Sequence, residues 1–199
     1  MSKTGSTTPD LTVLLGPLKL RTPLIALSGT FGYGTELEGL TKFEFLGAIT
    51  LKAVSLEPRT GNAYPRIVET PSGMLNCIGL ENPGLEVFVD EKLPAAAKLD
   101  VPLIANLVGD RIEDYVELAE SLDNQDDLAA LEINASCPNV EHGFLDFAAD
   151  RNIMYELVHT VRKATSKPLI AKLSPNVTDI VPIAEAAVDA GADVLNLGN

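Results

Sequence analysis

The chain has 199 residues, 46% hydrophobic and 5% aromatic, which is ordinary for one globular α/β domain. Its 15 basic and 28 acidic residues give a formal charge of −13, which disfavours nucleic acid or an anionic membrane as the main partner. No apolar run approaches the roughly 20 residues of a membrane helix, and the first nine residues lack the apolar core of a signal peptide, so we expect a cytoplasmic protein. Two cysteines are too few for a disulfide framework or a zinc site.

The predicted elements begin with an N-terminal β-hairpin, residues 11–15 and 18–20, turning at Gly16 and Pro17. Short apolar runs then read as buried parallel strands at residues 24–27, 48–51, 103–107, 128–133, 169–173 and 194–197. Helical periodicity lies between the later runs, at residues 112–122, 153–161 and 180–188. Helix boundaries are indicated by predicted N-caps at Asp110, Asp150 and Thr178 and by a C-terminal glycine, Gly191.

Alternating strands and helices fit either an open doubly wound sheet or a (β/α)₈ barrel. In an open sheet the polar site residues gather at one switch point, whereas in a barrel every strand can contribute one. Every predicted strand here ends at a polar residue, which favours the barrel. These residues are Ser28, Lys52, Asn106, Asn134, Lys172 and Asn196. A complete barrel of roughly 250 residues has two further βα units. We therefore expect a single, incomplete TIM-barrel domain over residues 1–199, truncated after about six strands, with residues 1–9 flexible.

Residues 131–139 carry the strongest chemical signal, because an apolar run there ends in Asn134, Ser136, Cys137 and Asn139. This places one potential base, the Cys137 thiol, among amide hydrogen-bonding groups. Cys137 alone could equally be a small packed residue. Lys52 and Lys172 also close apolar runs, where an unpaired ammonium is costly to bury, so both lysines are expected to need an anionic partner.

A glycine-dense loop precedes the third predicted strand. Residues 71–84 contain three glycines and two prolines beside Asn76 and Cys77, a composition that favours close approach of the backbone to a ligand.

Taken together, residues 11–199 resemble the dihydroorotate dehydrogenases, specifically the class 1 enzymes with a cysteine base and, within them, the NAD-linked class 1B type. The resemblance is carried by ordered motifs at residues 28–31, 50–53, 69–76, 78–80, 82–84, 134–139 and 172–175. It implies oxidation of dihydroorotate to orotate on bound FMN, in pyrimidine biosynthesis. It also implies a homodimeric core with an iron–sulfur and FAD subunit, forming a heterotetramer that passes electrons to NAD, with FAD and the 2Fe-2S cluster on the partner only.

The same resemblance implies roles for individual residues. Cys137 would be the base and Lys52 the second catalytic residue. The implied substrate contacts are Lys52, Asn76, Cys77, Ile78, Gly79, Leu80, Asn134, Asn139 and Asn199. The implied flavin contacts are Ser28, Lys52, Ala53, Asn106, Asn134, Lys172 and Gly198. No metal is implied.

The sequence departs from the family pattern in two places. Cys77 stands where the family more often has alanine, and we expect it to be a small packed residue. The glycine-rich loops that hold the flavin phosphate follow strands seven and eight in this family, and they are not in this sequence.

Three other functions stay open on the residues. A lyase could use Lys172 as a Schiff-base nucleophile. A dihydropyrimidine dehydrogenase would share the cysteine base but act on uracil or thymine. An incomplete barrel that lacks the FMN phosphate site could also be an inactive fragment.

Overall fold

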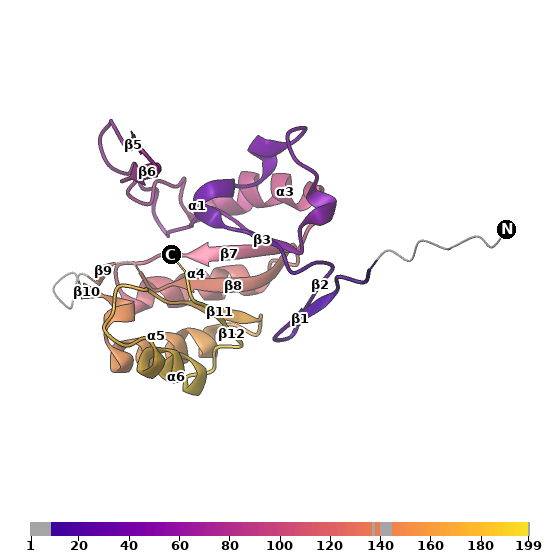
Figure 1. Ribbon diagram of the computed structural model, residues 1–199. Coiled ribbons are helices and arrows are strands. Elements are labelled where there is room, and N and C mark those ends of the chain that lie inside the picture. Colours follow the sequence, from indigo (N-terminus) through magenta and orange to yellow (C-terminus); the bar gives the residue numbers. More distant parts are fainter. Residues whose placement is uncertain (1–8, 137, 140–144, 199) are drawn as a thin grey trace.

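The computed structural model describes residues 9–136, 138–139 and 145–198, with the backbone alone for 138–139 and 145–146. Six parallel strands form the main sheet in the order β12-β11-β8-β7-β4-β3 (Figure 1). Their bounds are β3 Ile25–Ala26, β4 Ala48–Thr50, β7 Leu103–Leu107, β8 Leu128–Asn134, β11 Leu169–Lys172 and β12 Val194–Asn196. Each strand lies beside its predecessor in the chain without a reversal of order, which is barrel topology. The predicted incomplete TIM barrel is confirmed.

The helices pack against one face of the curled sheet, the outer one, and follow its curve (Figure 1). They are α1 Ser28–Phe31, α2 Leu85–Val87, α3 Leu93–Ala96, α4 Ile112–Asp123, α5 Arg151–Ala164 and α6 Val181–Asp189. A π-helical turn, Phe88–Lys92, joins α2 to α3. Short 3-10 turns cover Thr35–Leu37, Phe43–Phe45, Ala97–Leu99 and Phe147–Ala149. No helix in the described ranges is long and apolar enough to cross a membrane.

Three small antiparallel hairpins accompany the main sheet. The predicted N-terminal hairpin is confirmed as β1 Val13–Leu15 and β2 Leu18–Leu20, with Gly16 at φ +55 in the turn. The other two, which the periodicity did not predict, are β5 Ile67–Thr70 with β6 Gly73–Asn76, and β9 Pro138–Asn139 with β10 Leu145–Asp146.

The caps of the long helices correct part of the prediction. Asp150 caps α5 as expected, accepting hydrogen bonds from the backbone N–H groups of Asn152 and Ile153 at 2.7 and 3.2 Å. Asp110 is not the cap of α4, because the Asp114 carboxylate reaches back to accept from the backbone of Asp110 and residue 111 instead. Thr178 is likewise wrong as a cap for α6.

At the start of α6 the next residue, Asp179, makes the side-chain hydrogen bond that was expected of Thr178. The Asp179 carboxylate accepts a hydrogen bond from Val181 N at 3.0 Å. A side-chain oxygen must reach a free backbone N–H in the first helical turn, and here Asp179 makes that contact. Gly191 follows the end of α6 with φ +105, as predicted for a C-terminal glycine.

The two faces of the main sheet have different neighbours. In β4, β7, β11 and β8 from Ala130 on, residues with odd numbers pack with the helices in the large core. Residues with even numbers in these segments face the barrel interior, where Ala48, Ile104, Ala130 and Ile170 pack with Leu18 and Leu20 of the N-terminal hairpin. In β3 the parity is reversed, with Ile25 facing the interior. The hairpin therefore closes the N-terminal end of the interior, opposite the strand ends where polar residues gather.

Candidate active site at the carboxyl ends of the strands

The interior face of the sheet changes from apolar to polar towards the carboxyl ends of its strands. Asn106, Asn134, Lys172 and Asn196 occupy the last positions of this face on β7, β8, β11 and β12. The register places Lys172 directly between Asn134 and Asn196, because its Cα pairs with both. In a (β/α)₈ barrel this end of the strands is where active sites form.

A hydrogen-bonded chain connects these polar residues. Asn134 Nδ2 donates to Asn106 Oδ1 at 3.3 Å, and Asn106 Nδ2 donates to Glu132 Oε1 at 2.6 Å. Asn196 Nδ2 donates to the other carboxylate oxygen of Glu132 at 2.8 Å. Glu132 is only 3% exposed and was missed in the sequence. The sequence nevertheless contains a sign of its role. Glu132 is an acidic residue inside an apolar strand, and it lies two residues before Asn134, so both side chains are on the interior face.

Two buried oxygen atoms at this end of β8 have no hydrogen-bond partner in the part of the chain that the structure describes. They are Asn134 Oδ1 and Ser136 Oγ. Buried polar atoms are nearly always paired, so the unpaired Asn134 Oδ1 on the strand next to Lys172 indicates a place where a ligand binds. The backbone of Asn134 is held from α4, whose Tyr115 hydroxyl donates to Asn134 O at 3.0 Å.

Lys172 is half-buried on the same face. Burial lowers its pKa below the ordinary 10.5, and the negative charge of Glu132 opposes that change. Within the described ranges no carboxylate oxygen lies within 4.0 Å of its Nζ. An ammonium that is partly desolvated and without an ion pair favours binding of an anionic or electron-rich group at this position.

This environment gives a pH-dependent prediction for stability. We expect Lys172→Met to be more stable than the wild type at pH 7, with a margin that shrinks as pH rises toward 10.5. Between the lowered folded pKa and 10.5 the unfolded chain binds more protons than the folded one, so wild-type stability rises with pH in that window. Urea unfolding of both proteins between pH 7 and pH 10.5 measures the margin.

Lys19→Met is the matched control, because Lys19 is exposed on β2 at the opposite end of the sheet. It should leave stability unchanged across the same range. A Lys172→Met margin that stays constant with pH would contradict the proposed burial effect.

Lys52 follows β4 and is joined to the loop before α2. Its backbone N donates to Gly32 O at 2.8 Å, and its Nζ lies 4.0 Å from Glu81 Oε2. Arg66 contacts the same carboxylate oxygen at 2.7 Å. The Lys52 side chain is 34% exposed, so its ammonium is accessible while its charge is partly balanced by Glu81.

The loop itself reaches the strand ends through Leu80, which packs against Ala53 and Val108. Gly79 has φ +79, and a Cβ there would lie 2.7 Å from Asn62 N, so a side chain at this position would clash with the backbone. The loop is also fixed by buried Asn82, whose Oδ1 accepts from Ser55 N at 3.2 Å and Gly84 N at 2.9 Å. Asn82 is thus more than a turn residue, because it ties the loop to the end of β4.

The structure brings together one part of the predicted site. Lys52, Ala53, Asn106, Asn134 and Lys172 gather at the carboxyl ends of the strands and, with Glu132 and Asn196, form what we call the strand-end cluster. Leu80 packs against Ala53 of this cluster. Ser28 begins α1 after β3, and Gly198 N donates to Asn196 Oδ1 at 3.2 Å. Ile78 lies in the loop, where its carbonyl accepts from Asn62 N.

Other predicted residues are placed elsewhere or not described. Asn76 ends the exposed strand β6, and within the described ranges no hydrogen bond joins it to the strand-end cluster. Cys77 is an exposed free thiol, so the expectation of a packed residue is wrong, because the hairpin that carries it projects from the sheet (Figure 1). Cys137 and Asn199 lie outside the described residues, and Asn139 is described by its backbone alone.

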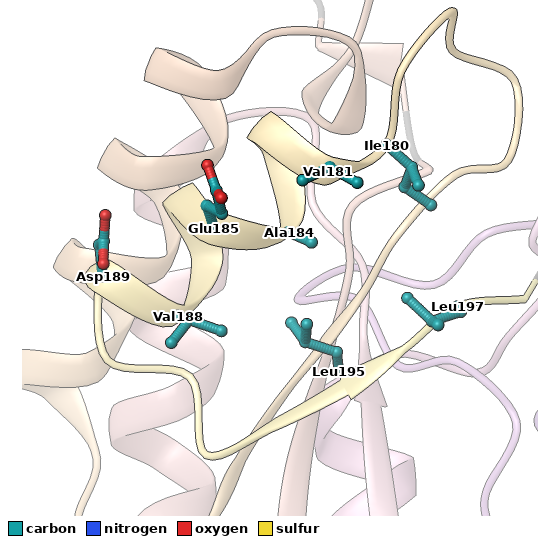
Figure 2. A pocket seen from close by; sticks show the side chains of 8 residues that line it. All are labelled: Ile180, Val181, Ala184, Glu185, Val188, Asp189, Leu195 and Leu197. Carbon is teal, nitrogen blue, oxygen red and sulfur yellow. The ribbon is translucent and has the colours of Figure 1, made fainter.

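A hollow of about 630 Å³ lies away from this polar cluster. It lies between α6 and the edge strand β12, where Val181, Ala184, Val188, Leu195 and Leu197 give it an apolar wall (Figure 2). Leu195 has an odd number and packs with the helix-facing core, so the hollow is on the outer side of the sheet. This hollow and the polar cluster are therefore on opposite faces of the sheet.

Comparison with known proteins places the chain in one family. The family model described as dihydroorotate dehydrogenase matches residues 10–199. Among curated relatives, the proteins of Geotalea daltonii, Geotalea uraniireducens and Geobacter sulfurreducens are 54%, 53% and 51% identical over 191 residues. Each is named dihydroorotate dehydrogenase B (NAD(+)), catalytic subunit. The match covers 96% of this chain and 63% of each relative. The chain belongs to the dihydroorotate dehydrogenase family.

Proposed function

We propose that the full-length protein oxidises dihydroorotate to orotate, the step that its relatives' names describe, as the catalytic subunit of an NAD-linked enzyme of pyrimidine biosynthesis. The observation that carries this proposal is the family match over residues 10–199, together with identity of 54% to a relative of that name. The strand-end cluster supports it, because two lysines and several amides there suit a small anionic ring.

The described residues fit a flavin ring. Asn134 Oδ1 is a buried acceptor without a partner, and Lys172 is a half-buried donor on the neighbouring strand. A flavin offers a ring N–H and carbonyl oxygens along one edge, which such an acceptor and donor complement. Ser28, Ala53, Asn106 and Gly198 would line the same cofactor. Bound FMN would supply the acceptor for the hydride that leaves C6 of the substrate.

The protein residues would then have distinct roles. We assign Cys137 as the base that removes the proton from C5, because a free thiol has a pKa of about 8.5 that nearby cations lower. Lys52 would offset the substrate carboxylate and fix the ring. Lys172 would stabilise negative charge where it develops at the flavin N1/O2 edge. Leu80 would cover the ring from the loop.

We propose the remaining substrate contacts at four asparagines and along the backbone of the loop before α2. Asn76, Asn134, Asn139 and Asn199 would hydrogen-bond the ring amides and the carboxylate. The backbone of residues 77–80 would approach the substrate, as the glycine at position 79 allows.

The electron acceptor and the assembly are also proposals. The relatives' names contain both "NAD(+)" and "catalytic subunit", which supports a partner polypeptide that carries the NAD chemistry. We propose a homodimeric core with an FAD and 2Fe-2S subunit, in a heterotetramer. The cytoplasmic location stays a prediction.

A charge-removal variant tests the role of Lys52. We expect Lys52→Met to weaken orotate binding by about 10- to 100-fold, because a hydrogen bond to a charged group contributes roughly 1.5–3 kcal/mol. Uracil lacks the carboxylate, so its affinity should change little. Isothermal titration of full-length protein with each ligand measures both effects, and Lys19→Met is again the control.

The same titration separates the second candidate function. A dihydropyrimidine dehydrogenase would bind uracil at least as well as orotate, and Lys52→Met would weaken neither selectively. Equal loss for the two ligands would therefore remove Lys52 from carboxylate recognition.

A lowered lysine pKa is also what a Schiff-base lyase needs, and Lys172 has one. Borohydride reduction in the presence of a carbonyl substrate would trap such an enzyme covalently. The family match makes us expect no adduct at Lys172.

A further inference from the structure

We propose that Glu132 is a positioning residue whose carboxylate sets the amide orientation of Asn106, and through it that of Asn134, so that the active site presents an acceptor oxygen to its ligand. This goes beyond the proposed function by assigning a role to a buried acidic residue. It rests on that function in the choice of orotate as a probe, because Asn134 is proposed above to contact both the flavin and the orotate ring.

The donors and acceptors of the hydrogen-bonded series Glu132, Asn106 and Asn134 fix its direction. An ionised carboxylate only accepts hydrogen bonds, so an amide that bonds to it must turn its NH₂ group towards it. Asn106 Nδ2 donates to Glu132 Oε1 at 2.6 Å, which leaves Asn106 Oδ1 on the other side of the planar amide. That oxygen accepts from Asn134 Nδ2 at 3.3 Å. The last acceptor of this hydrogen-bonded series is therefore Asn134 Oδ1, which is buried and accepts no hydrogen bond within the described ranges.

Turning over an amide would break the hydrogen bonds on both of its sides. If Asn106 turned over, its oxygen would face the carboxylate and its NH₂ would face the NH₂ of Asn134, so two like groups would meet at both contacts. Asn196 is fixed in the same way, since its Nδ2 donates to Glu132 Oε2 at 2.8 Å and its Oδ1 accepts from Gly198 N. One carboxylate thus fixes the orientation of the two amides that donate to it and, through Asn106, the orientation of Asn134.

A structural role alone does not account for an acidic side chain here. Glu132 is 3% exposed, and burying a carboxylate is costly unless hydrogen bonds and a positive charge compensate it. The neighbouring residues Leu131 and Ile133, fully buried on the outer face, already supply the packing of β8. The groups that face Glu132 are the amides of Asn106 and Asn196 and the charge of Lys172. All three belong to the strand-end cluster.

Glu132→Gln is the decisive variant, because glutamine keeps the shape but offers one acceptor and one donor. Only one of the two asparagines can then keep its present orientation. In full-length protein we expect orotate affinity to fall about tenfold by isothermal titration, with the side-chain amide signals of Asn106, Asn134 or Asn196 shifted in ¹H–¹⁵N spectra. The amide of Asn82, which is buried and bonded to Ser55 away from this chain, should not shift.

Glu117→Gln is the matched control, because Glu117 is exposed on α4 and its replacement removes the same charge. It should leave both readouts unchanged. If Glu132→Gln fails to fold, the wild-type spectrum still tests the proposal. The side-chain NH₂ protons of Asn106 and Asn196 should then be shifted downfield and show contacts to the Glu132 methylene protons.

The outcomes are distinguishable from failure of the proposed function. If the wild-type protein bound no orotate, the proposed function would be contradicted. The side-chain amide signals would still test the positioning role of Glu132. Unchanged orotate affinity and unchanged Asn134 signals in a folded Glu132→Gln protein would overturn the positioning role. A lower unfolding midpoint with normal affinity and normal amide signals would also overturn it, since that result marks a merely structural residue.

Discussion

Replacing Cys137 by serine in the full-length protein should slow reduction of the bound flavin by dihydroorotate by about 10²- to 10⁴-fold at pH 7, the range expected for loss of a general base. A serine hydroxyl is far harder to ionise than a thiol at this pH, whereas the groups that bind the ring are retained. Orotate affinity should therefore stay nearly unchanged. Anaerobic stopped-flow absorbance follows the reduction, and titration with orotate follows the binding.

Cys137→Ala distinguishes a lost base from a disturbed site. The serine variant retains a group that ionises at high pH, so its rate should rise steeply with pH, while the alanine variant should stay slow throughout. A wild-type reduction rate in either variant would remove Cys137 from the mechanism. Equal, pH-independent losses in both, accompanied by weak orotate binding, would indicate a packing role instead.

The largest expected effect on stability is at Phe147, in the 3-10 turn before α5. Its side chain is fully buried and lies edge-on to Tyr115, with ring centroids 5.5 Å apart. Phe147→Ala should lower the free energy of unfolding by about 3–5 kcal/mol, from lost burial and the cavity left behind. Urea unfolding measures it.

Phe45→Ala is the matched control, because the Phe45 side chain is 57% exposed. Its expected change is within about 0.5 kcal/mol. Since Tyr115 also holds the carbonyl of Asn134, Phe147→Ala should weaken orotate binding as well. A loss below 1 kcal/mol at Phe147 would show that this ring is not part of the core.

The parallel strands could be predicted because they are continuous apolar runs, and the long helices because their apolar residues have a regular period. The run at 103–107 matches β7 residue for residue, and the apolar spacing from Ile112 matches the buried face of α4, where Ala119 and Leu122 are fully buried. Periodicity works here because burial repeats with the geometry of the element.

The segment between β4 and β7 could not be predicted in this way. The β5–β6 hairpin is exposed along its length, so its sequence carries no alternation of buried and exposed residues. The π-helical turn Phe88–Lys92 also breaks the 3.6-residue period between α2 and α3. The position of Asn76 and the exposure of Cys77 follow from how this loop packs, which no local pattern encodes.

The polar residues at strand ends were predictable one by one, but their connections were not. Asn106, Asn134 and Lys172 each close an apolar run, which is visible in the sequence. Their grouping around Glu132 depends on the register between β7, β8, β11 and β12. Glu132 interrupts the apolar run at 128–133, but the run alone does not show which amides of the neighbouring strands surround it.

The most direct test of the proposed function is the anaerobic visible spectrum of the full-length protein before and after addition of dihydroorotate. We predict a flavin absorbance band that bleaches when dihydroorotate is added and does not bleach with dihydrouracil. A flavin band that dihydroorotate leaves unchanged would contradict the account, and so would equal bleaching by dihydrouracil.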